Sequence, residues 1–277
     1  MRLATLAIDG SATAAVLVNG HFVRLPAPDV GALLRLPVWR ALVEEHLADE
    51  PVVSAADADY LAVIPAPGKI LCCGLNYSEH ILETGRDLPE YPTLFAKFAD
   101  TLMAPHADLV LDGTSGTVDW EAELAVVVGA EVSRCTPEEA LGAIAGFTVA
   151  NDVSMRDWQK RTLQWLQGKA FDASTPLGPV LVTPDECDPA SGLAVTCTVN
   201  GELLQEGDTS TLVFDSAALI SYISQFTVLR PGDVVLTGTP GGVGMARTPP
   251  RYLADGDLMV TAIEGIGELR NRVRMPA

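Results

Sequence analysis

Two glutamates, Glu121 and Glu123, stand two positions apart in residues 118–129, VDWEAELAVVVG. The apolar second half of this stretch predicts a buried strand, on which residues two apart point to the same face. Asp119 is expected on that face too, near the entrance of one cavity. Like charges that are this close repel and resist desolvation, so either one carboxyl holds a proton or a cation lies between them. The alternative is a polar strand end with both glutamates in water.

The donor type limits which cation such a site would bind. Carboxylate oxygens with open positions suit Mg²⁺ or Mn²⁺, with Ca²⁺ as an alternative, and do not suit zinc. Residues 150–153 contain Asp152, which could add a third oxygen donor. The five cysteines are odd in number and lack CxxC spacing, so we expect reduced, mostly buried thiols.

His80 and Glu83 form a second candidate pair. If a helix begins near Ser78, these residues are three positions apart and share a face. A carboxylate beside an imidazole fixes its tautomer and raises its basicity, which is the arrangement of a general base. The alternative is an incidental surface pair.

The net charge of −18 over 277 residues argues against binding to nucleic acid or to an anionic membrane. Positive charge is nevertheless concentrated between residues 156 and 169, in Arg156, Lys160, Arg161 and Lys169. This clustering suggests a site for a small anion, and the alternative is an exposed basic helix face.

Two further polar residues stand in unusual surroundings. Lys97 lies in an apolar stretch, so it either extends its ammonium to solvent or is functional. Thr239 lies in the glycine-rich residues 238–244, which lack the Lys-Ser/Thr and GxGxxG patterns of nucleotide sites. Its hydroxyl and the backbone N–H groups there could instead bind a carboxylate.

The elements that position these residues are expected to be mostly β-strands. Buried strands are predicted at 69–76, 118–129 and 146–152, with hairpins at Asn19-Gly20 and Asn200-Gly201. Thr136 and Glu139 form a capping box that starts a helix to about residue 145. Further helices are predicted at 214–226 and at 155–167, the latter ending at Gly168. On that helix Arg156 and Gln159 share one face, and Trp158 and Trp165 share another, expected in the core.

Residues 1–66 are expected to form a small unit. They contain a hairpin and a helical stretch broken at Pro37, and the sequence IPAPG at 64–68 marks a connection. No apolar run reaches the length of a bilayer span, and the N-terminus has no signal-peptide pattern. Cytoplasmic residence is therefore the default expectation.

Seven motifs in this order resemble the fumarylacetoacetate hydrolase superfamily: GLNYSEH, VDWEAEL, NDVSMRDWQ, GKAFD, TPLGP, LRPGDVVLTGTPGGVG and IEGIGEL. The resemblance extends from about Ile64 to Asn271 and is closest to bacterial two-domain members. It implies a β-rich α+β fold, with a small N-terminal α+β domain at 1–66 and a mixed β-roll catalytic domain at 67–277. It also implies a homodimer.

The resemblance assigns roles residue by residue. It implies that Glu121, Glu123 and Asp152 bind the divalent metal and that His80 and Glu83 form the catalytic dyad. It implies that Asp119 is not a metal ligand and has a supporting or surface role. Residues that match positions lining the family's substrate site are Lys97, Arg156, Gln159, Lys169 and Thr239. Of these, Lys169 and Arg156 are expected to hold the substrate carboxylate and the developing enolate.

The activity implied is Mg²⁺- or Mn²⁺-dependent hydrolysis of a carbon–carbon bond in an acylpyruvate such as fumarylpyruvate or acetylpyruvate, as in aromatic catabolism. The partner would be a small anionic 2-oxo acid. Alternatives within the family are oxaloacetate decarboxylation and isomerisation or decarboxylation of 2-hydroxyhepta-2,4-diene-1,7-dioate. The intact His80/Glu83 pair favours hydrolysis. From other classes, a catalytically silent metabolite-binding protein and a cysteine-dependent enzyme remain alternatives.

Overall fold

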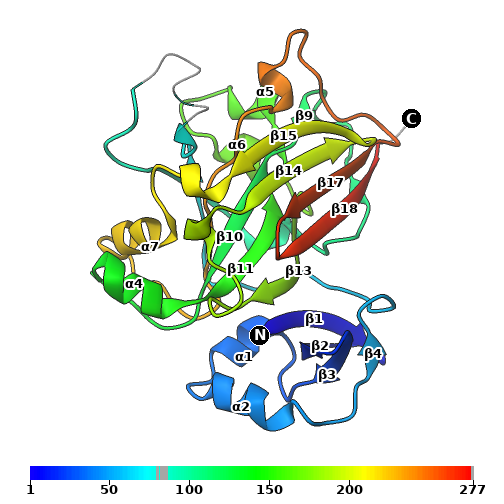
Figure 1. Ribbon diagram of the computed structural model, residues 1–277. Coiled ribbons are helices and arrows are strands. Elements are labelled where there is room, and N and C mark those ends of the chain that lie inside the picture. The colour runs from blue at the N-terminus through cyan, green and yellow to red at the C-terminus, as the bar shows by residue number, and fades with distance from the viewer. Residues whose placement is uncertain (79–80, 82–86, 276–277) are drawn as a thin grey trace.

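The computed structural model describes residues 1–78, 81 and 87–275. Figure 1 shows a large strand-rich body with a smaller N-terminal lobe below it. Strands predominate and the helices are short, which confirms the expected β-rich α+β fold. His80 and Glu83, the predicted dyad, lie outside the described residues.

The largest sheet is mixed. Its strands run in the order β4-β3-β2-β1-β13-β11-β10-β16-β5-β6, and β7 pairs with β13. The β16–β5 and β13–β7 pairs are parallel and the other pairs are antiparallel. The bounds are β1 Arg2–Ile8, β2 Ser11–Val18, β3 His21–Arg24, β4 Val53–Ser54, β5 Ile70–Gly74, β6 Thr93–Lys97, β7 Leu102–Met103, β10 Ala122–Val128, β11 Ile144–Asn151, β13 Thr175–Val182 and β16 Val234–Leu236.

A second sheet covers one face of the first. Its order is β15-β14-β17-β18-β8, and β14, β17 and β18 pack on β10 and β11 (Figure 1). A separate two-stranded ribbon pairs β9 with β12. The bounds are β8 Leu109–Val110, β9 Val118–Asp119, β12 Ser154–Met155, β14 Ala194–Val199, β15 Glu202–Asp208, β17 Leu258–Ile263 and β18 Gly267–Arg274.

Strand β10 is apolar on both faces because each face meets a different core. Leu124 and Val126 belong to the cluster between the two sheets, whereas Ala125 and Val127 belong to a second cluster shared with the N-terminal helices. A strand buried on both sides has a continuous rather than alternating apolar pattern. The N-terminal lobe joins the same sheet, because β1 pairs with β13. The proposed division at residue 66 stays a prediction.

The helices are short and lie around the sheets. The predicted capping box is present, since the Thr136 side chain accepts from Glu139 N at 3.3 Å and Glu139 Oε2 accepts from Thr136 N at 2.8 Å. The bounds are α1 Val30–Leu34, α2 Trp39–His46, α4 Pro137–Ala143, α5 Arg156–Gln159, α6 Leu166–Lys169 and α7 Ser216–Ser224, with 3₁₀ turns η1 Ala99–Thr101, η2 Pro189–Ser191, η3 Thr209–Thr211 and η4 Gly244–Ala246. No helix in the described part of the chain is long and apolar enough to cross a membrane.

The single strand predicted over 118–129 is wrong. It is interrupted between β9 and β10 at Trp120 and Glu121. Side chains replace the ladder there: Trp120 N donates to Asp119 Oδ1 at 2.9 Å, and Glu121 N donates to Asn151 Oδ1 at 3.0 Å. The chain thus passes from the β9–β12 ribbon into the large sheet, and Asp119 does not share a strand with Glu123.

The single helix predicted over 155–167 is also wrong, because it is two short helices, α5 and α6. A Cβ on Gly168 would lie 2.5 Å from Gln159 N and 2.5 Å from Met155 O. Gly168 is therefore not a helix stop but the point where α6 packs against the backbone of α5. The two tryptophans do not share a face: Trp158 packs on Phe171, and Trp165 packs on Phe95.

Candidate metal and anion site

Three buried carboxylates meet at the end of the β10–β11 pair. Oxygen atoms of Glu121, Glu123 and Asp152 all lie within 4.8 Å of one another. Glu123 is on β10, Glu121 precedes it, and Asp152 directly follows β11. Antiparallel pairing of Ala122 with Asn151 brings these ends together, and Asp152 N donates to Glu121 O at 2.8 Å.

Glu123 is the carboxylate with the least compensation. It is 1% exposed, and its Oε2 accepts from Gly238 N at 2.7 Å. Burial, and then the charges of Asp152 and Glu121, raise the pKa of Glu123 well above its ordinary range. Without a cation this carboxyl therefore keeps a proton more readily, and a divalent ion would displace that proton.

Asp152 is held by two buried ammonium groups. Lys97 Nζ lies 2.6 Å from its Oδ1, and Lys169 Nζ lies 2.7 Å from its Oδ2. Burial acts to raise the pKa of Asp152, but the charges of Lys169 and Lys97 outweigh it and lower that pKa. Desolvation opposes the charge on Lys169, yet Asp152 and Glu121 raise its pKa, so it remains an ammonium ion.

Glu121 connects the carboxylates to Arg156. Its Oε1 lies 2.7 Å from Arg156 Nη1, and its Oε2 lies 2.7 Å from Lys169 Nζ. Arg156 Nη1 also donates to Gln159 Oε1 at 3.0 Å, as expected for i,i+3 neighbours on α5. Arg156 is 4% exposed, so these contacts are shielded from water.

The described cluster is nearly balanced in charge. Its four carboxylates and three cationic side chains are Asp119, Glu121, Glu123, Asp152, Lys97, Arg156 and Lys169. With every group ionised, one negative charge remains, and a divalent cation would make the cluster positive by one. Each carboxylate has about four acceptor positions, so Asp152 can bind a metal as well as its two lysines. The all-oxygen donor set fits Mg²⁺ or Mn²⁺ and would then attract an anion.

A cavity of about 490 Å³ opens onto this cluster. Site residues predicted from the sequence that line it are Glu121, Glu123, Arg156, Gln159, Lys169 and Thr239. Lys97 and Asp152 do not line it; both side chains are fully buried, and Lys97 Nζ lies 2.6 Å from Asp152 Oδ1. The basic residues between 156 and 169 do not all face the cavity in the same way. Lys160 lies exposed at its rim, whereas the Arg161 guanidinium stacks 3.4 Å from the centroid of the Trp158 ring.

Asp119 faces away from this cavity, contrary to the first expectation from strand spacing. Its Oδ1 accepts from Gly244 N at 2.6 Å, and its Oδ2 accepts from Met245 N at 3.0 Å and from Arg156 Nε at 2.8 Å. It is fully buried, so the surface role is excluded and a role in supporting Arg156 remains.

Gln205 was not identified from the sequence. It is 1% exposed on β15; its Oε1 accepts from Ala122 N at 2.9 Å, and its Nε2 donates to Thr239 Oγ1 at 2.8 Å. Thr239 Oγ1 in turn donates to Ala122 O at 2.9 Å. Gln205 thus ties the glycine-rich loop to the start of β10. Its position in a hairpin strand gave no signal of this, because the partners are distant in sequence.

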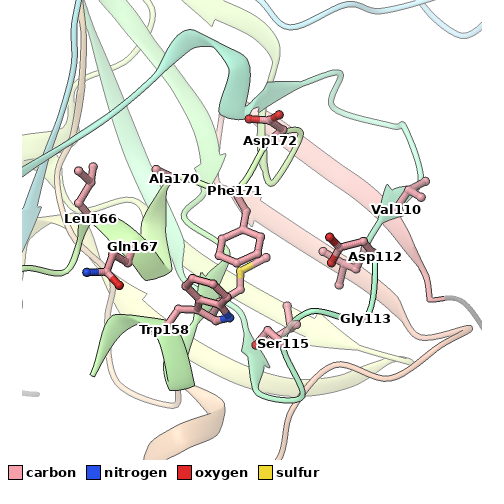
Figure 2. Close-up of a pocket in the computed structure, with 13 residues that line it drawn as sticks. Val110, Asp112, Gly113, Ser115, Trp158, Leu166, Gln167, Ala170, Phe171 and Asp172 are labelled. Atoms are coloured by element: carbon pink, nitrogen blue, oxygen red, sulfur yellow. The ribbon is translucent and has the colours of Figure 1, made fainter. Parts of the chain in front are cut away.

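A second cavity, of about 570 Å³, is bordered by Leu166 and Gln167 of α6 (Figure 2). Its lining includes Trp158, Phe171 and Met155, and none of the buried ion-paired side chains described above. The five cysteines are buried free thiols. Burial raises the pKa of Cys73, which borders the first cavity, to about 12, and this disfavours a cysteine nucleophile. Of these two cavities, the first is the one lined by the buried ion-paired side chains.

Comparison with known proteins identifies the family of the chain. Residues 69–274 match the family model described as fumarylacetoacetate (FAA) hydrolase C-terminal. The chain is 40% identical over 268 residues to the oxaloacetate tautomerase FAHD2B, mitochondrial, of Bos taurus, covering 96% of this chain and 85% of that protein. It also matches, over 100% of both chains, the structures of 5-carboxymethyl-2-hydroxymuconate delta-isomerase from Mycobacterium smegmatis (32% identity, TM-score 0.82) and of maleylpyruvate hydrolase from Sphingobium sp. SYK-6 in complex with manganese(II) ion and pyruvate (27% identity, TM-score 0.83). The chain belongs to the fumarylacetoacetate hydrolase family.

Proposed function

We propose that this protein is a divalent-metal-dependent enzyme that binds a 2-oxo dicarboxylate of the oxaloacetate type and interconverts its enol and keto tautomers. The observation that carries the proposal is the buried triad of Glu121, Glu123 and Asp152, which is bordered by the cations of Lys169 and Arg156. Relatives at 40–45% identity are named oxaloacetate tautomerases, which favours this substrate over an acylpyruvate.

The triad would hold Mg²⁺ or Mn²⁺, and the bound ion would supply Lewis acidity to the 2-oxo-carboxylate end of the substrate. Lys169, fixed between Glu121 and Asp152, would donate a hydrogen bond to the oxygen on which enolate charge develops. Arg156, held by Glu121 and Asp119, would bind a substrate carboxylate. These buried donors are already oriented before substrate arrives, which strengthens their electrostatic effect.

Tautomerisation moves one proton between carbon 3 and the 2-oxygen. His80, which stands three positions before Glu83 in the sequence, would act as the base at carbon 3, because an imidazole paired with a carboxylate has a pKa suited to proton transfer near neutrality. No water molecule attacks in this reaction, and no carbon–carbon bond breaks.

Acylpyruvate hydrolysis, the main expectation from the sequence, is the second candidate. The 27% identity to a maleylpyruvate hydrolase supports it, as does the predicted His80/Glu83 pair, which could deprotonate an attacking water. Oxaloacetate decarboxylation and isomerisation of a hydroxymuconate-type diacid use the same enolate stabilisation. Homodimer formation and cytoplasmic residence remain predictions, and light scattering on the purified protein would measure the former.

The test follows the enol form of oxaloacetate by its ultraviolet absorbance, with Mg²⁺ or Mn²⁺ present, and analyses the products by NMR. Faster loss of the enol to keto oxaloacetate, abolished by a chelator, supports the tautomerase. Fumarylpyruvate, maleylpyruvate and acetylpyruvate are offered in parallel. Pyruvate and an acid from these, with no acceleration of tautomerisation, would replace the tautomerase with the hydrolase. Pyruvate and CO₂ from oxaloacetate would indicate the decarboxylase.

A further inference from the structure

The Arg156 guanidinium has hydrogen-bond donors without an acceptor among the described residues. It carries five N–H groups in one rigid plane. Nε donates to Asp119, and Nη1 contacts both Glu121 Oε1 and Gln159 Oε1. Nη2 is buried and has no hydrogen-bond partner in the described part of the chain. Arg156 lines the metal and anion cavity, and a buried charged donor without an acceptor is costly. Nη2 is closed to solvent in this structure, so an anion would satisfy it after a small shift of the neighbouring side chains.

The contacts of Asp119 determine which nitrogen of the Arg156 guanidinium has no hydrogen-bond partner. Its four contacts are Gly244 N at 2.6 Å and Trp120 N at 2.9 Å on Oδ1, and Met245 N at 3.0 Å and Arg156 Nε at 2.8 Å on Oδ2. A carboxylate has about four acceptor positions, so Asp119 is saturated. It has no free position for a cation or a substrate and can act only by orienting its donors.

The same carboxylate fixes part of the cavity wall. Val243 and Met245 line the cavity, and Gly244 lies between them. A Cβ on Gly244 would lie 2.7 Å from Asp119 Oδ1 and 1.9 Å from Arg251 O, so this loop has little freedom to shift. Asp119 therefore sets the guanidinium plane and the adjacent loop relative to each other.

We propose that Asp119 is a positioning residue of the anion site. By binding Nε, it leaves Arg156 Nη2 without an acceptor among the described residues, so that an N–H group of Nη2 can donate to one carboxylate of an incoming anion. Because Nη1 of the same guanidinium contacts Glu121, that carboxylate lies next to the metal triad and is the one beside the 2-oxo group. The identity of the anion rests on the proposed function, whereas the orientation of Arg156 does not.

The test compares Asp119→Asn with Asp157→Asn. Asp157 is an exposed neighbour on α5 whose carboxylate binds Ser115 and Thr117, so its replacement removes the same charge without touching the cavity. Calorimetry measures binding of Mn²⁺ and then of oxalate in the presence of Mn²⁺. We expect Mn²⁺ affinity to stay within about threefold of wild type in both variants, but oxalate affinity to fall about tenfold or more in Asp119→Asn only, as for loss of a charge-assisted contact. With a substrate that turns over, KM should rise more than kcat falls.

Equal oxalate affinity in Asp119→Asn and wild type would overturn the proposal. If Asp119→Asn does not fold, wild-type protein with ¹⁵N-labelled arginine decides, with Arg156→Lys used to assign the Arg156 signals. The Nε–H should stay protected from solvent exchange with and without oxalate, and the Nη2 proton signals should shift when oxalate binds. Exposure of Nε–H on oxalate binding would overturn the proposal. Normal binding of Mn²⁺ and oxalate without turnover of oxaloacetate would reject the tautomerase and leave Asp119 in its role.

Discussion

Lys169 Nζ lies 2.7 Å from Asp152 Oδ2, within a site where Lys97 occupies the other oxygen of the same carboxylate. Asp152 is thus compensated by two cations. Glu123 has no ion pair among the described residues and accepts one backbone N–H. Burial acts to raise the pKa of both acids, but the two lysines outweigh it at Asp152, so the pKa of Asp152 is lowered and that of Glu123 is raised.

Replacement of Glu123 should remove metal binding and turnover together. Glu123→Gln keeps the shape of the side chain but removes the negative charge and one of the two oxygen ligands. Because loss of residues that only support a metal ligand costs 10–100-fold in affinity, loss of this ligand should weaken Mn²⁺ binding by about 100-fold or more. Calorimetric Mn²⁺ titration measures this, with the exposed Glu138→Gln as the control. Unchanged Mn²⁺ affinity would remove Glu123 from the metal site.

The metal-free protein should lose stability as pH rises. Burial raises the pKa of Glu123 above its ordinary value of 4.5, so its contribution is full below that pH and is lost as pH rises through the higher folded-state value. The lowered pKa of Asp152 affects stability only below pH 3.8, the ordinary pKa of an aspartate, where stability falls as the pH falls. Burial lowers the pKa of His106, so its contribution to stability increases as pH rises towards 6.5, opposite to the contribution of Glu123.

Subtracting the Tm of Glu123→Gln from the Tm of wild type removes the contribution of His106, which both proteins share, and leaves the contribution of Glu123. Measured by calorimetry without metal between pH 4.5 and 8, the wild-type Tm should fall relative to the variant. Saturating Mg²⁺ or Mn²⁺ should reverse the trend, since a metal binds the ionised carboxylate. Parallel curves for the two proteins would show that Glu123 does not titrate in this range.

Lys97 should contribute to stability through Asp152 rather than through substrate. Both side chains are 0% exposed and their charged atoms lie 2.6 Å apart. Lys97→Met removes one partner of a buried pair, which typically costs about 3–5 kcal/mol. Urea unfolding should show this loss without metal and a smaller loss with Mn²⁺, because the ion compensates Asp152. A variant of wild-type stability with a raised KM would instead support direct contact with substrate.

Gly168 should be essential for the position of Lys169. A Cβ at Gly168 would clash with backbone atoms of α5, so Gly168→Ala should cost about 1–3 kcal/mol through overpacking. It should also lower turnover by displacing α6. Gly142→Ala is the matched control: it is exposed on α4, nothing lies within 4 Å of its Cβ, and it should gain about 0.5–1 kcal/mol. Equal stability of the two variants would contradict the packing described for α6.

His80→Ala should leave metal binding intact and remove catalysis of proton transfer. The prediction rests on the spacing of His80 and Glu83 in the sequence. Mn²⁺ titration and the enol-loss assay on the same preparation measure the two properties separately. Retained tautomerisation, or retained hydrolysis of an acylpyruvate, would sink the general-base assignment.

Local spacing in the sequence determined much of this protein. Asn19-Gly20 and Asn200-Gly201 form the predicted hairpin turns, with positive φ at all four residues, because few other residues tolerate that backbone conformation. The Thr136 capping box starts α4 where expected. The two-residue spacing of Glu121 and Glu123 and the order of the motifs indicated the carboxylate site. The hairpin turns and the capping box depend on contacts within a few residues.

Tertiary structure decided the rest, because the groups that determine it are far apart along the chain. Lys97 and Asp152 are 55 residues apart, and Gln205 and Ala122 are 83 apart. The break at Trp120 and Glu121 exists because Asn151, from another strand, takes the place of a ladder partner. Helix 155–167 is divided because Gly168 packs against the backbone of Met155 and Gln159. Residue types and local periodicity do not encode which buried charge meets which, since that pairing depends on how the sheets and loops pack in space.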